Sequence, residues 1–207
     1  MEINLEDEKG NRITECLSLK RKKPRKLIRF TIMRMNILLT GYGPFLRNKT
    51  NPSGQVSSAL NGVVLEVSYA KVASFLERED SDFLLSLGLH AQATQPRLEV
   101  RAQNKVNRVT PDVYGIIPKD YEIEKEEGDL ATLVDIPELY AHLIKKGFPC
   151  SISDNAGTYL CNYLYFKALK KKKGNALFIH FPPVSEEWPL ERMKAFVEEV
   201  QTWLRHQ

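Results

Sequence analysis

Residues 150–170 read CSISDNAGTYLCNYLYFKALK and contain the signals for a strand, a turn and a helix in succession. The first four, Cys150–Ser153, form a short apolar run that is typical of a buried strand. The polar turn that follows offers Asp154 or Asn155 as a helix cap, and the apolar spacing beyond it predicts a helix over about residues 157–170. A strand leading into a helix is a building unit of parallel sheets, because parallel neighbours need a crossover connection.

The same alternation continues on both sides of this unit. The predicted strands are 36–40, 63–67, 83–87, 130–134 and 176–181, and the predicted helices are 52–60, 69–78, 137–146 and 190–204. Strands separated by helices predict an α/β fold, here a single-domain α/β/α sandwich with a mostly parallel central sheet. We expect the strand at 83–87 to end at Gly88, and residues 113–128, which show no period, to form a long loop.

Length and composition fit a globular domain with a hydrophobic core. The chain has 207 residues, of which 43% are hydrophobic and 27% are charged, so we exclude a disordered or low-complexity protein. No apolar run approaches the roughly 18 residues of a membrane-spanning helix, and we expect no membrane partner. Cys16, Cys150 and Cys161 are too scattered for a disulfide framework, which indicates a reducing, cytoplasmic environment.

Basic charge is concentrated at the N-terminus. Residues 1–34 hold ten Lys or Arg and five Asp or Glu, a local charge of +5 in a chain of +4, so residues 35–207 carry −1. The run KRKKPRK at 20–26 could bind nucleic acid phosphates or serve as an address, but no aromatic residues are interleaved to stack bases. We therefore expect no nucleic acid partner and interpret 1–34 as a basic extension, either disordered or upstream of a start at Met33 or Met35.

Ligands of open α/β sheets bind beyond the carboxyl ends of the strands, which directs attention to four places: 41–45, the segment around Glu99, 154–161 and His180. Cys161 is expected in the first turn of its helix, where free N–H groups and the dipole would lower the pKa of the thiol. A thiolate can attack an acyl group, a histidine can protonate the leaving amine, and a carboxylate can orient that histidine. The alternative for Cys161 is a buried small apolar residue.

The remaining histidines, His90, His142 and His206, lack the spacing of metal ligands, so we expect them on the surface or in ordinary packing. Gly41-Tyr42-Gly43 is not followed by Gly-Lys-Ser/Thr and is interpreted as a turn rather than a phosphate-binding loop.

Four blocks of the sequence resemble one enzyme family, in that family's order. Residues 153–162 fit the motif S-x-x-A-G-T-Y-x-C-N. Residues 40–45, followed by Asn51-Pro-Ser53, resemble T-G-F-x-P-F…N-P-[ST], and residues 178–182 are similar to F-I-H-[VIL]-P. Residues 99–104 match E-R-x-A-x-N at the Glu, Ala and Asn positions. On these motifs the chain resembles pyroglutamyl peptidase I, the pyrrolidone-carboxylate peptidases.

The resemblance implies a cysteine exopeptidase that removes an N-terminal pyroglutamyl residue from peptides. It also implies an α/β/α fold over residues 35–207, a cytoplasmic location, a homo-oligomer (dimer or tetramer), and neither metal nor cofactor. Carried over by motif, Cys161 is the nucleophile, His180 is the general base and acid, and Glu99 orients His180.

The resemblance also implies a substrate pocket. Tyr42 and Phe45 stand at positions with which the family sandwiches the lactam ring, and Tyr159 and Leu160 are expected as wall residues. Because pyroglutamate is uncharged, the pocket should be apolar. Arg108 is the nearest match to an arginine that the family places beyond its glutamate.

Three departures from the family pattern keep a second hypothesis open. Leu46-Arg47 stands where the family has Gly-Gly, the segment from Gly88 to Arg97 lacks the second glycine of G-x-x-x-G-R, and the segment between Gly62 and Leu65 is shorter. The alternative is therefore a related cysteine hydrolase or amidase with altered substrate specificity.

Overall fold

The computed structural model describes residues 5–6, 12–13, 35–45 and 50–207. The chain divides into two units, residues 1–33 and 34–207. In the first unit, β1 (Leu5–Glu6) pairs antiparallel with β2 (Arg12–Ile13). Most of the basic extension lies outside the described residues, as does Leu46-Arg47, so the expectations for both stay predictions.

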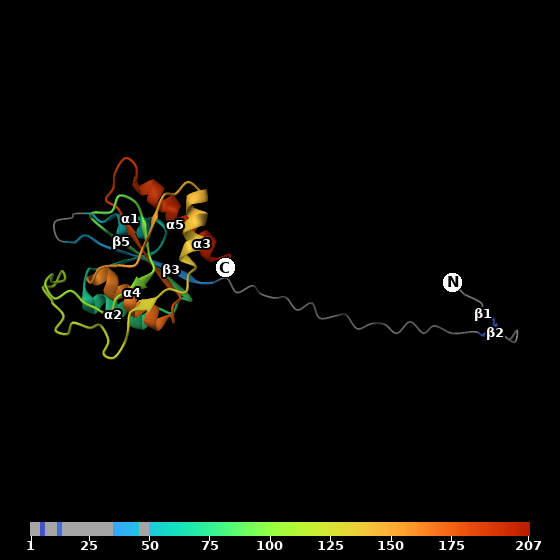
Figure 1. Cartoon of the computed structure of the whole chain (residues 1–207), viewed down its shortest axis with the longest axis horizontal. Helices are drawn as coiled ribbons and strands as arrows, with labels where there is room; N and C mark the ends of the chain where they lie inside the picture. Colours follow the sequence, from blue (N-terminus) through green and yellow to red (C-terminus); the bar gives the residue numbers. More distant parts are fainter. Residues whose placement is uncertain (1–4, 7–11, 14–34, 46–49) are drawn as a thin grey trace. The chain divides into compact units, whose positions relative to one another are not determined.

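A six-stranded sheet in the order β4-β3-β5-β10-β6-β9 forms the centre of the second unit (Figure 1). Its strands are β3 (Ile37–Tyr42), β4 (Val63–Leu65), β5 (Phe83–Leu89), β6 (Arg97–Glu99), β9 (Ser151–Ser153) and β10 (Ala176–Phe181). Only β10 and β6 run antiparallel among these neighbours, which confirms the prediction of a mostly parallel sheet. A separate short ribbon pairs β7 (Arg101–Ala102) with β8 (Leu130–Ala131).

Helices cover both faces of this sheet (Figure 1). They are α1 (Pro52–Ala59), α2 (Tyr69–Arg78), α3 (Ile136–Lys145), α4 (Leu160–Lys171) and α5 (Leu190–Leu204). One hydrophobic core lies under α1, α3 and α5, and a second lies under α2 and α4. The unit is therefore the predicted α/β/α sandwich.

The alternation of side chains along each strand decides which of them face α4. In β10, Leu177 and Ile179 belong to the core under α1, α3 and α5, whereas Phe178 belongs to the core under α2 and α4. Because successive side chains point to opposite faces, His180 lies on the same side as Phe178. Glu99 of β6 is on this side too, since it bonds to His180. Polar chemistry is thus gathered on the α4 face of the sheet.

Several expectations about the elements were wrong. The strand predicted over 36–40 continues through Gly41 and Tyr42, so these two residues belong to β3 and not to a turn. Of the strand predicted over 130–134, only Leu130 and Ala131 are paired, in the separate ribbon with β7. The strand predicted to end at Gly88 continues to Leu89, because Gly88 pairs in register with His180 of β10. The helix predicted from residue 157 begins at Leu160, and its cap residue, Tyr159, makes no side-chain capping bond. The pattern also missed β6 and β7, whereas the long loop was confirmed, since the described segment between Ala102 and Leu130 contains no helix or strand.

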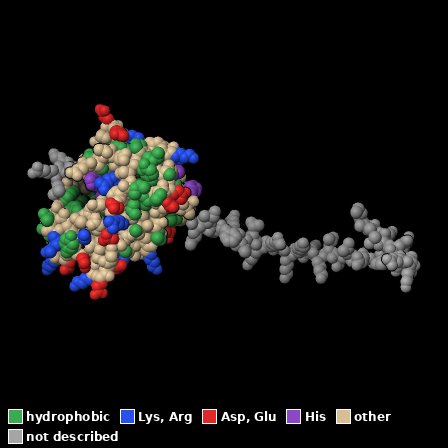
Figure 2. All heavy atoms as spheres, in the orientation of Figure 1, with side chains coloured by type: hydrophobic (Ala, Val, Ile, Leu, Met, Phe, Trp, Pro, Cys, Tyr) green, Lys and Arg blue, Asp and Glu red, His purple; other side chains and the backbone are tan. Residues whose placement is uncertain are grey.

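The surface of the folded unit is mixed in charge. On the face shown in Figure 2, Lys and Arg side chains are interspersed with Asp and Glu, in keeping with the charge of −1 over residues 35–207. None of the helices in the described part of the chain is long and apolar enough to cross a membrane.

Phe196 of α5 provides a test of the larger core. It is fully buried and packs edge-on against Phe148, Phe181 and Trp188. Phe196→Ala is expected to lower the free energy of unfolding by about 3–5 kcal/mol, because it removes an aromatic side chain and leaves a cavity. Glu198→Ala, at an exposed position of the same helix, should change it by less than about 0.5 kcal/mol. Equal urea denaturation curves for the two variants would contradict this packing.

Candidate active site

A buried histidine–carboxylate pair lies at the centre of the candidate site. His180 Nδ1 is 2.8 Å from Glu99 Oε1, and the two side chains are 4% and 0% exposed. Across the antiparallel β10–β6 pair, His180 stands opposite Arg97, so its bond to Glu99 runs diagonally. A carboxylate only accepts hydrogen bonds, so Nδ1 carries the proton and Nε2 is the nitrogen left to accept another one.

The thiol of Cys161 lies close to this pair. Cys161 is the second residue of α4, as its predicted place in the first turn requires, and its side chain is partly buried. A Cβ added to Gly88 would stand only 3.0 Å from Cys161 Sγ, and Gly88 is the strand neighbour of His180. The thiol and the imidazole are therefore both adjacent to Gly88, although no hydrogen bond joins these two described side chains.

The prediction of a lowered pKa for this thiol was wrong. Burial raises the pKa of Cys161 to about 12, and the nearby charge of Glu99 acts in the same direction, while its own backbone N–H opposes them. The helix terminus is present, but removal of the thiol from water outweighs it. At neutral pH Cys161 is thus a thiol, and a base must take its proton before the sulfur can attack.

An apolar cavity of about 240 Å³ opens beside the thiol. Its lining residues are Tyr42, Phe45, Asn51, Val67, Leu89, Ala91, Tyr159, Leu160 and Cys161. The rings of Phe45 and Tyr159 lie 5.2 Å apart between centroids. The hydroxyl of Tyr42 donates a 2.8 Å hydrogen bond to the carbonyl oxygen of Leu160, which ties the cavity wall to the start of α4.

The structure thus brings together most of the residues that the sequence singled out. Tyr42, Phe45, Tyr159 and Leu160 share one cavity with Cys161, and His180 of the Glu99–His180 pair is the strand neighbour of Gly88, which the thiol contacts. Arg108 is exposed on the segment between β7 and β8 and does not line this cavity. Its role in substrate binding stays a prediction.

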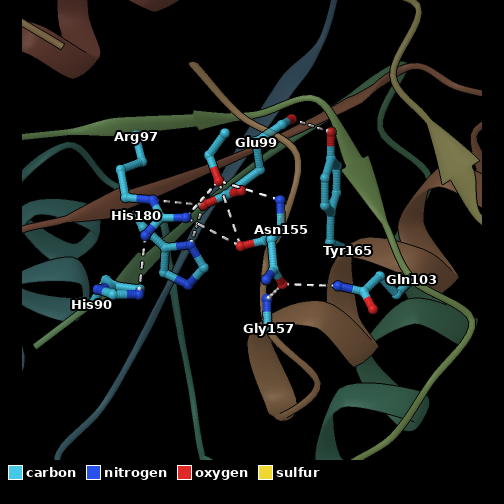
Figure 3. A network of polar contacts seen from close by, with 9 residues as sticks. His90, Arg97, Glu99, Gln103, Asn155, Gly157, Tyr165 and His180 are labelled. Carbon is cyan, nitrogen blue, oxygen red and sulfur yellow. Dashed lines mark hydrogen bonds and ion pairs between the residues drawn. The ribbon is translucent and has the colours of Figure 1, made fainter. Parts of the chain in front are cut away.

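Two residues that the sequence did not single out join the pair (Figure 3). The His90 ring, expected on the surface or in ordinary packing, lies 5.7 Å from the His180 ring between centroids. Arg97 lies between His90 and Glu99, with Nη1 3.1 Å from His90 Nε2 and Nε 3.5 Å from Glu99 Oε1. The contact between Arg97 and Glu99 could have been predicted from their spacing, because side chains two residues apart in a strand point to the same face of the sheet.

Helix α4 is attached to the neighbouring chain segments by two further polar residues. The hydroxyl of Tyr165 donates to the carbonyl oxygen of Glu99 at 2.7 Å. The buried side chain of Asn162 accepts from the amide of Gln103 and donates to the carbonyls of Gln103 and Lys105. These bonds fix the thiol relative to the carboxylate.

No cluster of three or more His, Cys, Asp or Glu side chains within the described ranges is arranged to hold a metal ion.

Comparison with known proteins identifies the family of this chain. A sequence model described as "Pyroglutamyl peptidase" matches residues 35–194. The chain belongs to the pyroglutamyl peptidase family. The resemblance seen in the sequence motifs is thereby confirmed, and the chain is a member of a family of cysteine peptidases.

Relatives within the pyroglutamyl peptidase family match over most of both chains. The pyrrolidone-carboxylate peptidase of Thermococcus litoralis is 33% identical over 167 residues, which cover 70% of this chain and 76% of the relative. That of Fusobacterium nucleatum is 32% identical over 173 residues, covering 73% and 79%. The solved structure of the Thermococcus litoralis enzyme matches with a TM-score of 0.72 at 26% identity, covering 82% of this chain and 92% of that one.

Gly88 allows a test of the close approach between β5, β10 and α4 in this family member. A Cβ at this position would stand 2.8 Å from the Phe178 ring and 3.0 Å from Cys161 Sγ. Gly88→Ala is expected to lower the free energy of unfolding by about 1–3 kcal/mol, because the methyl group overpacks this contact. Gly128→Ala, where a Cβ meets nothing within 4 Å, is the matched control. Unfolding midpoints measured in urea should separate the two, and equal midpoints would contradict the contact.

Proposed function

We propose that the protein hydrolyses the amide bond after an N-terminal pyroglutamyl residue of peptides, using Cys161 as nucleophile, His180 as base and acid, and Glu99 to orient His180. One observation carries the proposal: His180, bonded to Glu99 at 2.8 Å in a buried pair, and the Cys161 thiol, which lines an apolar cavity, are both adjacent to Gly88. Membership of the pyroglutamyl peptidase family supports the choice of substrate.

The pair supports the following acylation step. His180 Nε2 takes the Cys161 proton, and the sulfur attacks the pyroglutamyl carbonyl carbon. Glu99, which accepts from His180 Nδ1, stabilises the imidazolium that forms. The tetrahedral intermediate collapses as the imidazolium protonates the departing amine, which leaves pyroglutamate bound to sulfur as a thioester.

Deacylation uses the same residues in the reverse sense. His180 removes a proton from a water molecule, the hydroxyl attacks the thioester carbonyl, and the proton returns to the Cys161 sulfur as pyroglutamate leaves. For the oxyanion in both steps, the amide of Cys161 is the natural donor. The N–H groups in the first turn of α4 have no partner within the helix, and Tyr159 offers them no side-chain cap.

The cavity suits an uncharged ring. A pyroglutamyl group is a five-membered lactam, and a pocket of about 240 Å³ with aromatic walls offers it apolar contact. The rings of Phe45 and Tyr159, 5.2 Å apart between centroids, form part of these aromatic walls. The carboxylate of Glu99 is fully buried and does not line the cavity, so it is not offered to the substrate.

Peptides that begin with pyroglutamate are the partners implied by this proposal. The homo-oligomeric state and the cytoplasmic location stay predictions.

The first test is release of a fluorogenic amine from its pyroglutamyl amide. The wild-type protein should release the amine in the presence of reductant, and Cys161→Ala should abolish release while retaining the wild-type urea denaturation curve, because the nucleophile is lost. Cys150→Ala, which alters the other described cysteine at a buried position away from the site, should keep most of the activity.

The outcomes of this assay separate the two candidate functions. Rapid cleavage of the pyroglutamyl amide, with slow cleavage of prolyl and N-acetyl amides, supports the pyroglutamyl peptidase. A folded wild type that cleaves one of the other acyl amides faster would instead support the related cysteine hydrolase with altered specificity. Activity that persists in Cys161→Ala would rule out the thiol mechanism.

Glu99 has a test of its own. Glu99→Gln keeps the shape of the side chain but removes the charge that stabilises the His180 imidazolium, so kcat is expected to fall about 10³- to 10⁴-fold, with KM nearly unchanged. Steady-state kinetics beside Glu198→Gln, an exposed carboxylate on α5, provides the comparison. A kcat within tenfold of the wild type would remove Glu99 from the mechanism.

A further inference from the structure

We propose that Arg97 and His90 act as a positioning pair for the Glu99–His180 pair: His90, as a neutral acceptor, holds the Arg97 guanidinium in place, and Arg97 holds Glu99 as a correctly aimed carboxylate. The inference rests on the proposed function, since it assigns a role to two residues around the same catalytic pair. It concerns residues that do not touch the substrate cavity and act only through Glu99 and His180.

Arg97 is held at several points of its guanidinium. Nη1 meets His90 Nε2 at 3.1 Å, while Nη2 donates to Ser153 Oγ at 2.5 Å and to the carbonyl of Asn155 at 3.2 Å (Figure 3). With those contacts made, Nε lies 3.5 Å from Glu99 Oε1, the same oxygen that accepts from His180. The guanidinium is therefore oriented by three residues besides the carboxylate: His90, Ser153 and Asn155.

Glu99 needs such a neighbour because of where it lies. Its side chain is 0% exposed, and within the described chain its second oxygen, Oε2, has no hydrogen-bond partner. A carboxylate without water is stable only beside an opposite charge or several donors. His180 supplies a single donor, so the remaining stabilisation comes from Arg97, whose own side chain is 25% exposed and keeps part of its hydration.

His90 can serve Arg97 only in its neutral form. Arginine always donates, so the 3.1 Å contact requires that His90 Nε2 accept, which places the proton on Nδ1. The surroundings favour this form: burial lowers the pKa of His90, and the positive charge of Arg97 and the neighbouring His180 lower it further, against the opposing charge of Glu99. If His90 were protonated, its Nε2 would carry a hydrogen and could no longer accept from Arg97, and the two positive charges would repel each other.

The charged and titratable groups gathered here come from three elements and one loop. Arg97 and Glu99 lie on β6, His180 on β10 and Cys161 at the start of α4, while His90 directly follows β5. Removing the positive charge of Arg97 favours the protonated form of each titrating neighbour. The expected pH effect is therefore a shift to higher pH, whichever of these groups is responsible.

The test is the pH profile of kcat/KM for pyroglutamyl amide hydrolysis. In Arg97→Gln the acid limb should move to higher pH by about one unit, as expected when an opposite charge near a carboxylate is removed, and KM should change less than about twofold. Arg97→Lys keeps the charge and should keep the limb close to that of the wild type. The matched control is Arg101→Gln, which removes an exposed arginine paired with Asp129 and should not move the limb.

The His90 contact is tested by rescue. His90→Ala removes the acceptor and should lower kcat about tenfold, as loss of an outer-shell orienting group commonly does. His90→Gln restores an oxygen acceptor that does not titrate, and should recover most of that loss. His142→Ala removes a partly buried histidine bonded to Glu199 on the opposite side of the sheet, and serves as the control. Equal losses in His90→Ala and His90→Gln would overturn the role of His90.

Failure of this inference can be told from failure of the proposed function. An active wild type whose acid limb does not move in Arg97→Gln relative to Arg101→Gln overturns the positioning role alone. An inactive wild type overturns the proposed substrate. The positioning role is then tested without substrate, by the pH dependence of Cys161 alkylation by iodoacetamide, followed by peptide mass mapping. A shift of that dependence to higher pH in Arg97→Gln supports the electrostatic role, and coincident curves overturn it.

Discussion

Glu99 and His180 are hydrogen-bonded on the α4 face of the sheet, where both side chains are almost completely buried. Two ionisable groups in such a place demand partners, and much of the surrounding structure supplies them. β6 runs antiparallel to β10 and brings the carboxylate within reach, Arg97 lies beside that carboxylate, and Tyr165 binds the backbone of Glu99 from α4. The polar pair thus lies where the strand direction reverses, between β10 and β6, and β9 runs in the same direction as β6.

Much of the fold could be predicted from local patterns because most elements bury a clear apolar stripe. Helix α2 was placed at the residues where it lies, since Ser68 precedes a regular run in which Val72 and Leu76 face the core. β6 was missed for the opposite reason: Arg97-Leu98-Glu99 has one apolar residue, and it is a strand only because β10 and β9 pair with it on both sides. Pairing of that kind is a property of the assembled sheet and leaves little trace in the local sequence.

Some features of the candidate site could likewise be predicted from the sequence, and others could not. The place of Cys161 at the start of α4 and that of His180 at the end of β10 could be predicted from spacing and from the family motifs, because both depend on local elements. The raised pKa of the thiol could not, since it comes from burial by segments distant in the sequence. The contact between His90 and Arg97 could not be predicted either, because Arg97 reaches His90 across a turn that has no periodic pattern.

The order of the strands has a consequence for how the chain folds during synthesis. β10 lies between β5 and β6 in the middle of the sheet, yet it is the last of the six strands to be made. Until residue 181 has emerged, the strands β4-β3-β5 and the strands β6-β9 have no common neighbour to join them. The sheet can close only after nearly the whole chain is available, so we expect folding to be late, rich in long-range pairing and dependent on protection of two incomplete sheet edges from other chains.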